Sequence, residues 1–476
     1  MEPSASLADR ESILPVLNTG AFVTLALFVA LIPFPYGAVT PAGTFTLLAS
    51  SFGIGALAFL TRPSRRAIGL AVLPLTALGL IALVGVVQLL PMSIGTLRRI
   101  APISATTYAD ANEILELFNR RAIVPKISIA PSDTQATILL TLAYGVLFAS
   151  ATILGSTRLR RRILVGALIL SAVVHVLYST TTTLAMERLH GTFINPNHFA
   201  GYLQIALAFA FGIAWREMLY TSDRATGIRD LGERWEKRAI QMIGPALLWG
   251  VIAAGLALTR SRGGILAAML ATIILIALAL LYRGKTSMRR SAIPIVLVVI
   301  AGVLFVATTT GDAPLLRLLA SDPREIGADT RTRIWSASLS AFRQAPVLGS
   351  GLGTFREAFR RVQPASVVGL VEQAHNDFLQ MLVTGGWVGA TLVTIAVGSM
   401  LIILLRAWLR QRRREESAVA LAGIGAMIAL ILHGLVEFNM SIPAIPATLA
   451  VMLGVAWAAA THEQRRPSPR AADPAP

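Results

Sequence analysis

The sequence has little charge for its length and no cysteine. Only 14% of its 476 residues are charged, and 55% are hydrophobic, whereas soluble proteins carry about 25% charged residues. This composition excludes an ordinary soluble chain and predicts a membrane protein. The absence of cysteine excludes disulfide bonds and is compatible with an oxidising outer face.

Long stretches without Asp, Glu, Lys or Arg dominate the chain. A helix needs about 20 apolar residues to span a bilayer, and eleven stretches reach that length, at 12–61, 67–97, 134–157, 163–186, 189–215, 239–259, 263–282, 291–311, 378–405, 417–436 and 438–462. Prolines and glycines interrupt the first stretch between 33 and 43, which predicts two helices joined by a tight turn. Lipid offers the backbone no hydrogen-bond partners, so each span should be helical. The prediction is an all-α polytopic membrane protein with about 12 transmembrane helices.

The basic residues are unevenly distributed between the two sides of these spans. If the N-terminus is cytoplasmic, the inner segments hold 26 of the 42 Lys and Arg residues, whereas Asp and Glu divide almost evenly. The positive-inside rule then predicts an inner-membrane protein with both termini in the cytoplasm. The net charge of +17 therefore mainly reflects membrane insertion, and no nucleic-acid partner is expected.

Two outer segments are long enough to contribute to a site, at 98–133 and 312–377. In the second, Trp335, Leu339 and Phe342 repeat at helical spacing, which predicts an amphipathic helix. The chain is accordingly divided into N-terminal transmembrane helices with the first long periplasmic segment (1–130), a transmembrane domain that includes the periplasmic loop 312–377 (131–462), and a disordered cytoplasmic tail (463–476).

Arginines gather at the predicted outer ends of separate spans. The whole connection between two spans is 260–264, which contains Arg260 and Arg262. Snorkelling explains one such arginine, but not two on the side where positive charge is disfavoured. Arg331 and Arg333 in the long outer loop add to them. Because guanidinium groups donate forked hydrogen bonds to phosphate oxygens, we expect a lipid-linked phosphate or pyrophosphate ligand.

Histidines accompany these arginines. Four of the six lie near the predicted outer face, namely His190, His198, His375 and His433. An imidazole can accept a proton from a hydroxyl near neutral pH. Asn195 and Asn197 precede a span and are expected to cap it, while Asn376 follows His375. His175 lies inside a span and is expected to be a packed core residue.

A metal centre and a transporter are the alternative classes. The sequence has neither His-Glu-x-x-His nor Asp-x-Asp, so no metal is expected, although Glu372, Asp377, Glu437, His375 and His433 include suitable ligand types. A 12-helix envelope transporter has the same number of spans. It is disfavoured because no predicted span contains Asp, Glu, Lys or Arg for ion coupling.

Several motifs together resemble the O-antigen ligase and polymerase superfamily of bacterial envelopes. In chain order they are GTFINPNHFAG (191–201), SRGG (261–264), RIW (333–335), HNDFLQ (375–380), HGLVEFN (433–439) and IPA (442–444). The resemblance covers about residues 130–462 and depends on the order and spacing of the motifs. Glu437 stands where an aspartate is more frequent.

The resemblance implies a membrane glycosyltransferase of C-type architecture without metal or cofactor. Such an enzyme takes a glycan from undecaprenyl pyrophosphate at the periplasmic face. Carried over to this sequence, it implies that Arg262 and Arg333 grip the pyrophosphate and that His375 activates the acceptor hydroxyl. Further substrate-binding candidates, chosen by position alone, are Arg260, Asn195, Asn197, His198 and Asn376.

The expected reaction inverts the anomeric centre, with the lipid A core as the acceptor. Polymerisation of lipid-linked repeats and transfer to protein hydroxyls need the same donor chemistry, so both stay open as alternatives. Besides donor and acceptor, the only partners expected are membrane lipids.

Overall fold

The computed structural model describes residues 5–61, 65–182, 188–220, 229–283, 326–410 and 414–461. Within these ranges all regular elements are helices, and ten helices are long and apolar enough to cross a membrane. A shorter apolar helix covers Val72–Gln88. The predicted all-α polytopic membrane fold is thus confirmed. The number of spans stays a prediction, because 291–311, like the tail 463–476, lies outside the described residues.

The long helices run back and forth, and short helices connect some of them at one end. In chain order the elements are α1 (Ala5–Leu31), η1 (Tyr36–Ala38), α2 (Pro41–Leu60), α3 (Arg65–Gln88), α4 (Ile94–Ile100), α5 (Pro102–Leu117), α6 (Pro131–Leu154), α7 (Arg158–Thr182), α8 (Pro196–Tyr220), α9 (Arg229–Leu258), α10 (Arg262–Arg283), α13 (Ile326–Arg343), α14 (Phe355–Arg360), α15 (Asp377–Arg410), α16 (Arg414–Gly434), η2 (Asn439–Ser441) and α17 (Ala444–Thr461). The two helices predicted for the first charge-free stretch are α1 and α2, and the predicted amphipathic helix is α13.

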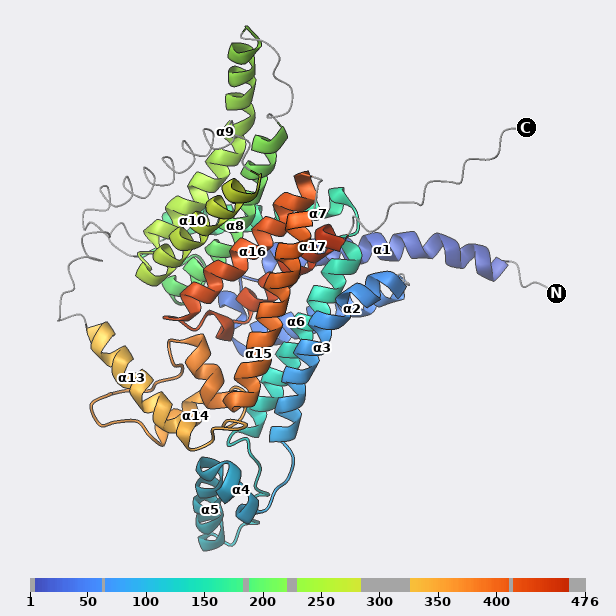
Figure 1. Ribbon diagram of the computed structural model, residues 1–476. Coiled ribbons are helices and arrows are strands. Elements are labelled where there is room, and N and C mark those ends of the chain that lie inside the picture. The colour runs from blue at the N-terminus through green and yellow to red at the C-terminus, as the bar shows by residue number, and fades with distance from the viewer. Residues whose placement is uncertain are drawn as a thin grey trace.

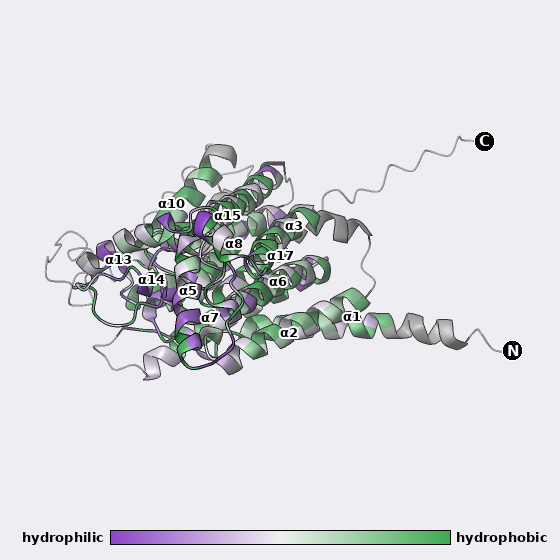
Figure 2. Cartoon of the chain, turned by 90° about the horizontal axis from the view of Figure 1, so that it is seen from below, coloured by the Kyte–Doolittle hydropathy of each residue, from purple (hydrophilic) through white to green (hydrophobic). Residues whose placement is uncertain are grey.

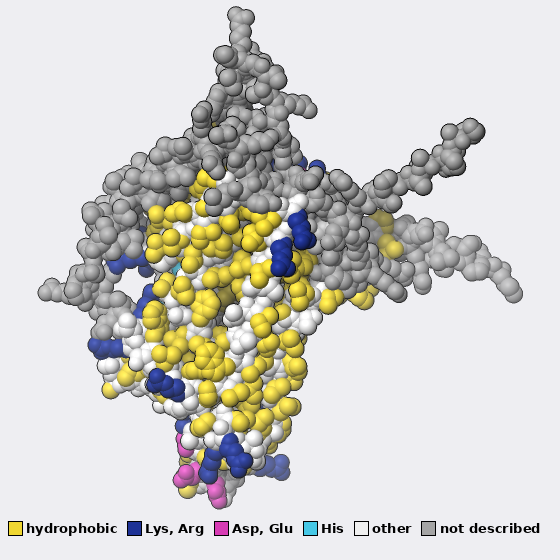
Figure 3. Space-filling view, in the orientation of Figure 1, with side chains coloured by type: hydrophobic (Ala, Val, Ile, Leu, Met, Phe, Trp, Pro, Cys, Tyr) yellow, Lys and Arg dark blue, Asp and Glu magenta, His cyan; other side chains and the backbone are white. Residues whose placement is uncertain are grey.

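The short helices α4, α5, α13 and α14 lie at the lower end of the bundle, and the N-terminal part of α9 lies at the upper end (Figure 1). Seen from below, hydrophilic residues gather around α13, α14 and α5, whereas α1, α2, α6 and α17 are mainly hydrophobic (Figure 2). Hydrophobic side chains cover the middle of the face in Figure 3, and its acidic side chains lie at the lower end. This distribution is the one that a bilayer around the middle of the bundle requires.

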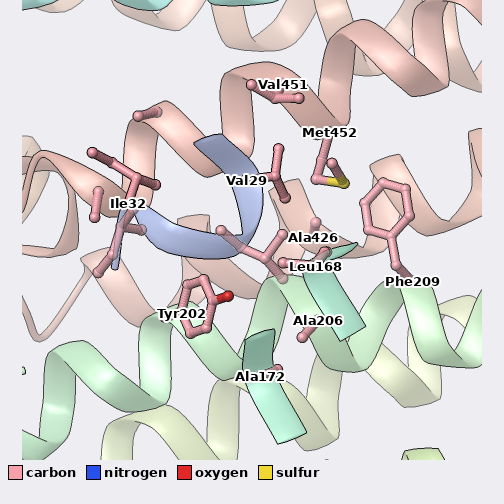
Figure 4. Close-up of a cluster of buried hydrophobic side chains, with 14 of the residues drawn as sticks. Val29, Ile32, Leu168, Ala172, Tyr202, Ala206, Phe209, Ala426, Val451 and Met452 are labelled. Atoms are coloured by element: carbon pink, nitrogen blue, oxygen red, sulfur yellow. The ribbon is translucent and has the colours of Figure 1, made fainter. Parts of the chain in front are cut away.

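Small residues allow the central helices to approach closely, as is typical of helix packing in membranes. A Cβ atom on Gly212 of α8 would lie 2.9 Å from the Ala418 carbonyl oxygen of α16, and one on Gly454 of α17 would lie 2.5 Å from the Phe148 oxygen of α6. Side chains from α1, α7, α8, α16 and α17 meet in the core that Figure 4 shows. This packing fixes α8 relative to α16, and α17 relative to α6.

A break in α15 ties the long outer loop to the bundle. Gly386 has φ 62° and ψ −165°, a conformation that only glycine adopts readily. The freed backbone bonds to the loop instead, since Trp387 N–H donates to the Pro346 oxygen (2.8 Å) and Gly351 N–H donates to the Thr384 oxygen (3.1 Å). The buried Gln88 side chain of α3 also donates to the Thr384 oxygen (2.9 Å). The loop that follows α13 is therefore fixed to both α15 and α3.

Candidate active site

The lower ends of α8, α9, α10, α15 and α16 are connected by backbone contacts. Leu189 N–H donates to the Leu258 oxygen (3.1 Å), and Asp377 N–H donates to the Glu437 oxygen (3.2 Å). The Gln204 side chain of α8 donates to the Gly264 oxygen of α10 (2.7 Å). Motifs that are far apart in the sequence therefore meet in one place.

The motif 261–264 has a structural explanation at each position except the arginine. The buried Ser261 accepts the N–H of Gly264 at Oγ (3.3 Å), which caps the start of α10. A Cβ on Gly263 would lie 2.6 Å from Cγ2 of Val436, and one on Gly264 would lie 3.1 Å from Cε1 of His433. The serine and glycines therefore position the start of α10, and with it Arg262, against the end of α16.

Glu437 is the centre of the site. Its side chain is 2% exposed and bonds to residues from three separate segments. Oε1 accepts hydrogen bonds from Asn197 Nδ2 of α8 and from Arg331 Nη2 of α13, each 2.5 Å long. Oε2 lies 3.3 Å from His375 Nδ1, just before α15. The sequence left the role of this residue in doubt, and the structure makes it the residue that joins the motifs.

Glu437 carries its charge although it is buried. Burial alone raises the pKa of its carboxyl group, but the hydrogen bond from His375 and the positive charge of Arg331 outweigh burial, so that the pKa lies below its ordinary value. The carboxylate is therefore ionised at neutral pH and accepts from all of its neighbours.

This depressed pKa predicts a pH dependence of stability. A folded-state pKa below the unfolded value gives stabilisation that is present above the ordinary glutamate pKa of 4.5 and is lost as the pH falls through the folded-state value. We expect thermal unfolding of the wild type in detergent to shift downward over this acidic window. The Glu437→Gln variant should not show the part of this shift that protonation of Glu437 causes. Glu372→Gln, at an exposed position, should show the same shift as the wild type. Identical pH profiles for Glu437→Gln and wild type would contradict the assignment.

Hydrogen bonds to the residues before and after His375 fix its backbone. Its φ is 50°, in the left-handed region that non-glycine residues rarely adopt and that clusters at functional sites. Before it, the Ala374 oxygen accepts from Trp335 Nε1 (3.0 Å). After it, Asn376 Oδ1 accepts the N–H groups of Phe378 and Leu379, both at 3.0 Å. Asn376, predicted to bind substrate, thus caps α15 with its side-chain oxygen and fixes the turn at His375.

The contact with Glu437 also sets the tautomer of His375. An ionised carboxylate only accepts, so Nδ1 carries the proton and donates to Oε2. Nε2 is then the basic nitrogen. The imidazole is 30% exposed and packs edge-on against Phe438, with 4.8 Å between ring centroids. This arrangement matches that of a general base, in which a second group orients the ring.

Arg188 links Glu437 to three further arginines. Arg188 donates from Nη2 to Asn197 Oδ1 (2.6 Å) and from Nε to the Thr259 oxygen (2.8 Å). Desolvation lowers the pKa of Arg188, Glu437 raises it, and the charges of Arg260, Arg331 and Arg262 lower it further. These charges therefore lie close enough to interact. Asp377 also interacts with Glu437, and four arginines against these two carboxyl groups still leave a positive excess, which suits an anionic ligand.

The structure distinguishes Arg331 from Arg333. Both lie on α13, but residues two positions apart point in different directions on a helix. Arg331 bonds to Glu437, whereas Arg333 lies on an exposed part of α13. The connection between α9 and α10 is 259–261 rather than the predicted 260–264, because Ser261 caps a helix that already begins at Arg262. Its middle residue, Arg260, has a left-handed backbone with φ 51°.

The remaining predicted residues lie at the start of α8. Asn195 Oδ1 accepts the N–H of Asn197 (2.8 Å), and the Asn195 carbonyl accepts that of His198 (3.0 Å), so Asn195 begins the helix. Asn197 connects Arg188 to Glu437. His198 is 5% exposed and packs edge-on against Phe438, with 4.5 Å between centroids. Of these three, Asn197 contacts the central carboxylate.

Sequence reasoning missed Arg188 altogether. The available signal was a basic residue on the predicted outer side, three positions before the motif 191–201. His433, by contrast, is fully buried in α16 and neither ring nitrogen has a hydrogen-bond partner among the described residues. Across the described ranges, no three His, Asp or Glu side chains are close enough to share a metal ion.

Residues 246–394 match a family model described as O-antigen ligase. The resemblance to the O-antigen ligase superfamily is confirmed. The matched segment contains Arg260, Arg262, Arg331, Arg333 and His375, whereas Glu437 lies outside it. No curated protein matches the chain.

This O-antigen ligase match indicates the general type of reaction. Members of the family are membrane glycosyltransferase-like enzymes, and the family implies a function like that of O-antigen ligases or polymerases, with glycan and lipid-linked substrates. Arg331 and His375, two partners of the buried Glu437, lie within the matched segment, and Glu437 with its partners is the candidate active site.

Proposed function

We propose that the protein transfers a glycan from undecaprenyl pyrophosphate to a hydroxyl of the lipid A core at the periplasmic face of the bacterial inner membrane. The observation that carries this proposal is the contact between His375 Nδ1 and the buried, ionised Glu437, within a group of arginines. It supplies an oriented base next to an excess of positive charge. Both are needed when a hydroxyl displaces a pyrophosphate.

In this mechanism His375 Nε2 takes the proton of the acceptor hydroxyl. The hydroxyl oxygen attacks the anomeric carbon, the bond from that carbon to the phosphate oxygen breaks, and undecaprenyl pyrophosphate leaves with the bonding electrons. Attack from the side opposite to the leaving group inverts the anomeric centre. The residues of this chain perform each step, and no metal is required.

The arginines stabilise the leaving group. Arg262 and Arg333 hold the pyrophosphate in this proposal, with Arg260 beside them. A unit cation about 4 Å from a phosphate charge contributes about 4 kcal/mol at an effective dielectric constant near 20, before desolvation is counted. Arg331 and Arg188 are bonded within the protein and keep Glu437 and Asn197 in place. Asn195, His198 and Asn376 shape the surrounding backbone for the acceptor.

Transfer by the purified full-length protein tests this function. Proteoliposomes containing undecaprenyl-pyrophosphate-linked glycan and lipid A core should yield glycosylated core. Arg262→Ala should lower the rate about 10²-fold, as loss of one preorganised electrostatic group does. Arg343→Ala, at an exposed position of α13, is the matched control and should retain activity. Movement of the donor across the membrane without a new glycosidic bond would instead identify a transporter.

A deletion strain then tests the acceptor. If the protein ligates the glycan to the lipid A core, the core of the deletion strain should lack the transferred glycan. Single repeats on the core would indicate a polymerase, and unglycosylated envelope proteins would indicate a protein O-oligosaccharyltransferase. All three acceptors require the same donor chemistry. The deletion strain therefore identifies the acceptor and does not test the transfer reaction itself.

A further inference from the structure

An apolar cavity of about 450 Å³ lies between α7, α8, α9 and α16, at the end of the bundle opposite to the candidate active site. This volume is within the range of about 300–1,000 Å³ for small-molecule sites. Most of its lining is aliphatic or glycine, with Phe209 as its aromatic residue. The charged residues that line it are Arg161, Arg162, Arg216 and Glu415, and all four lie where α7 and α16 begin and α8 ends.

The length of the cavity corresponds to half a bilayer. Its lining along α7 extends from Arg161 to Val173. At about 1.5 Å per residue these 12 steps cover about 18 Å, and one leaflet contributes about 15 Å of hydrocarbon. With the arginines at the membrane surface, the apolar part of the cavity reaches about the middle of the bilayer. An acyl chain attached to a surface headgroup has this reach.

The cavity also opens sideways to the surface that faces lipid. Two of its lining residues, Leu170 and Leu248, are 62% and 38% exposed. A Cβ atom on Gly166, another lining residue, would meet nothing within 4 Å. A lipid chain can therefore enter from the bilayer without crossing the protein.

The charges at the mouth favour a negative headgroup. Each of the three arginines that line the cavity is paired with a carboxylate, Arg161 with Glu416, Arg162 with Glu415 and Arg216 with Glu217. Arg158, which shares Glu416, and Arg160 lie at the same end of α7, so five arginines against three glutamates leave an excess of positive charge. Glu415 is bonded to Arg162 at 2.7 Å, and the Arg162 side chain is still 53% exposed, so a phosphate can approach it. Basic pockets between transmembrane helices are known to bind anionic lipid headgroups. We propose that this cavity binds one acyl chain of an anionic phospholipid, with the lipid phosphate at Arg162 and Arg216.

Native mass spectrometry of the full-length protein tests this site with dioleoylphosphatidylglycerol and dioleoylphosphatidylcholine as probes. The wild type should retain phosphatidylglycerol more strongly than phosphatidylcholine. Gly166→Leu places a side chain in the empty space and should lower phosphatidylglycerol affinity at least about tenfold, the cost of excluding about two methylene groups. The control Gly53→Leu, in α2 where a Cβ also meets nothing within 4 Å, should bind like the wild type.

A second pair of variants tests the headgroup. Arg162→Gln combined with Arg216→Gln should abolish the preference for phosphatidylglycerol. Arg160→Gln should keep it, because the Arg160 guanidinium faces Phe22 of α1 at 4.9 Å from the ring centroid. Equal binding of both lipids by the wild type would overturn the proposal, as would equal retention by Gly166→Leu and Gly53→Leu. Glycan transfer is measured separately, so loss of that activity leaves this result unaffected.

Discussion

Replacing His375 by alanine is expected to lower glycan transfer by about 10²- to 10⁴-fold, the usual contribution of a positioned general base. The loss should appear in kcat, because the proton is transferred only in the transition state. Donor binding should change little, since the arginines remain in place. Initial rates in proteoliposomes, with helix content checked by circular dichroism, measure this effect.

His190→Ala is the matched control for this prediction. His190 bonds through Nδ1 to the Phe193 oxygen within its own loop (2.9 Å), away from the contacts of Glu437. Its replacement should therefore leave kcat within a few-fold of the wild type. If His375→Ala and His190→Ala had similar rates, His375 would not be the base.

Glu437→Gln separates the base from the group that positions it. Glutamine can still bond to Asn197 but no longer provides a carboxylate that fixes the proton on Nδ1 of His375. We expect a smaller loss of kcat than for His375→Ala, and Glu437→Asp should recover part of it because the charge returns. A double variant at both positions should be no slower than His375→Ala alone, since residues that act as one unit are not additive.

The membrane architecture could be predicted because its physical cause is local. Uncharged runs of sufficient length give helices wherever the solvent is lipid, and the break between α1 and α2 was visible in the prolines around Pro33. His175 was expected to be a packed core residue, and it is fully buried with Nδ1 2.7 Å from the Ser171 oxygen. Each of these statements needs only a short window of sequence.

The centre of the site could not be predicted in the same way. Glu437 meets Asn197, Arg331 and His375, which are 240, 106 and 62 residues away in the chain. No local sequence pattern indicates that these distant residues are in contact. The choice between Arg331 and Arg333 depends on which face of α13 is turned toward Glu437, and both arginines looked equivalent in the sequence. Arg188 reaches the site because the end of α9 lies beside the start of α8, so that its side chain bonds to both Thr259 and Asn197.

Replacing Arg331 by glutamine is expected to destabilise the protein by about 1–3 kcal/mol, because the buried Glu437 loses the arginine bonded to it and keeps Asn197 and His375 as its hydrogen-bond partners. The remaining partner, Glu437, is 2% exposed and cannot be rehydrated without opening the site. Arg333→Gln is the matched control, two residues away on the same helix and at an exposed position. It should change stability by less than about 0.5 kcal/mol. Thermal or denaturant unfolding in detergent compares the two.

The double variant Arg331→Gln with Glu437→Gln identifies the cause of this destabilisation. If the cost comes from the unpaired carboxylate, removing that charge should recover stability, with a coupling of about 1–3 kcal/mol between the two sites. Additive effects would instead mean that Arg331 stabilises α13 through packing alone. Transfer assays complete the comparison, because Arg333→Gln should raise KM for the lipid-linked donor without unfolding the protein. A stable Arg331→Gln variant together with an unstable Arg333→Gln variant would reverse the roles assigned to these two arginines.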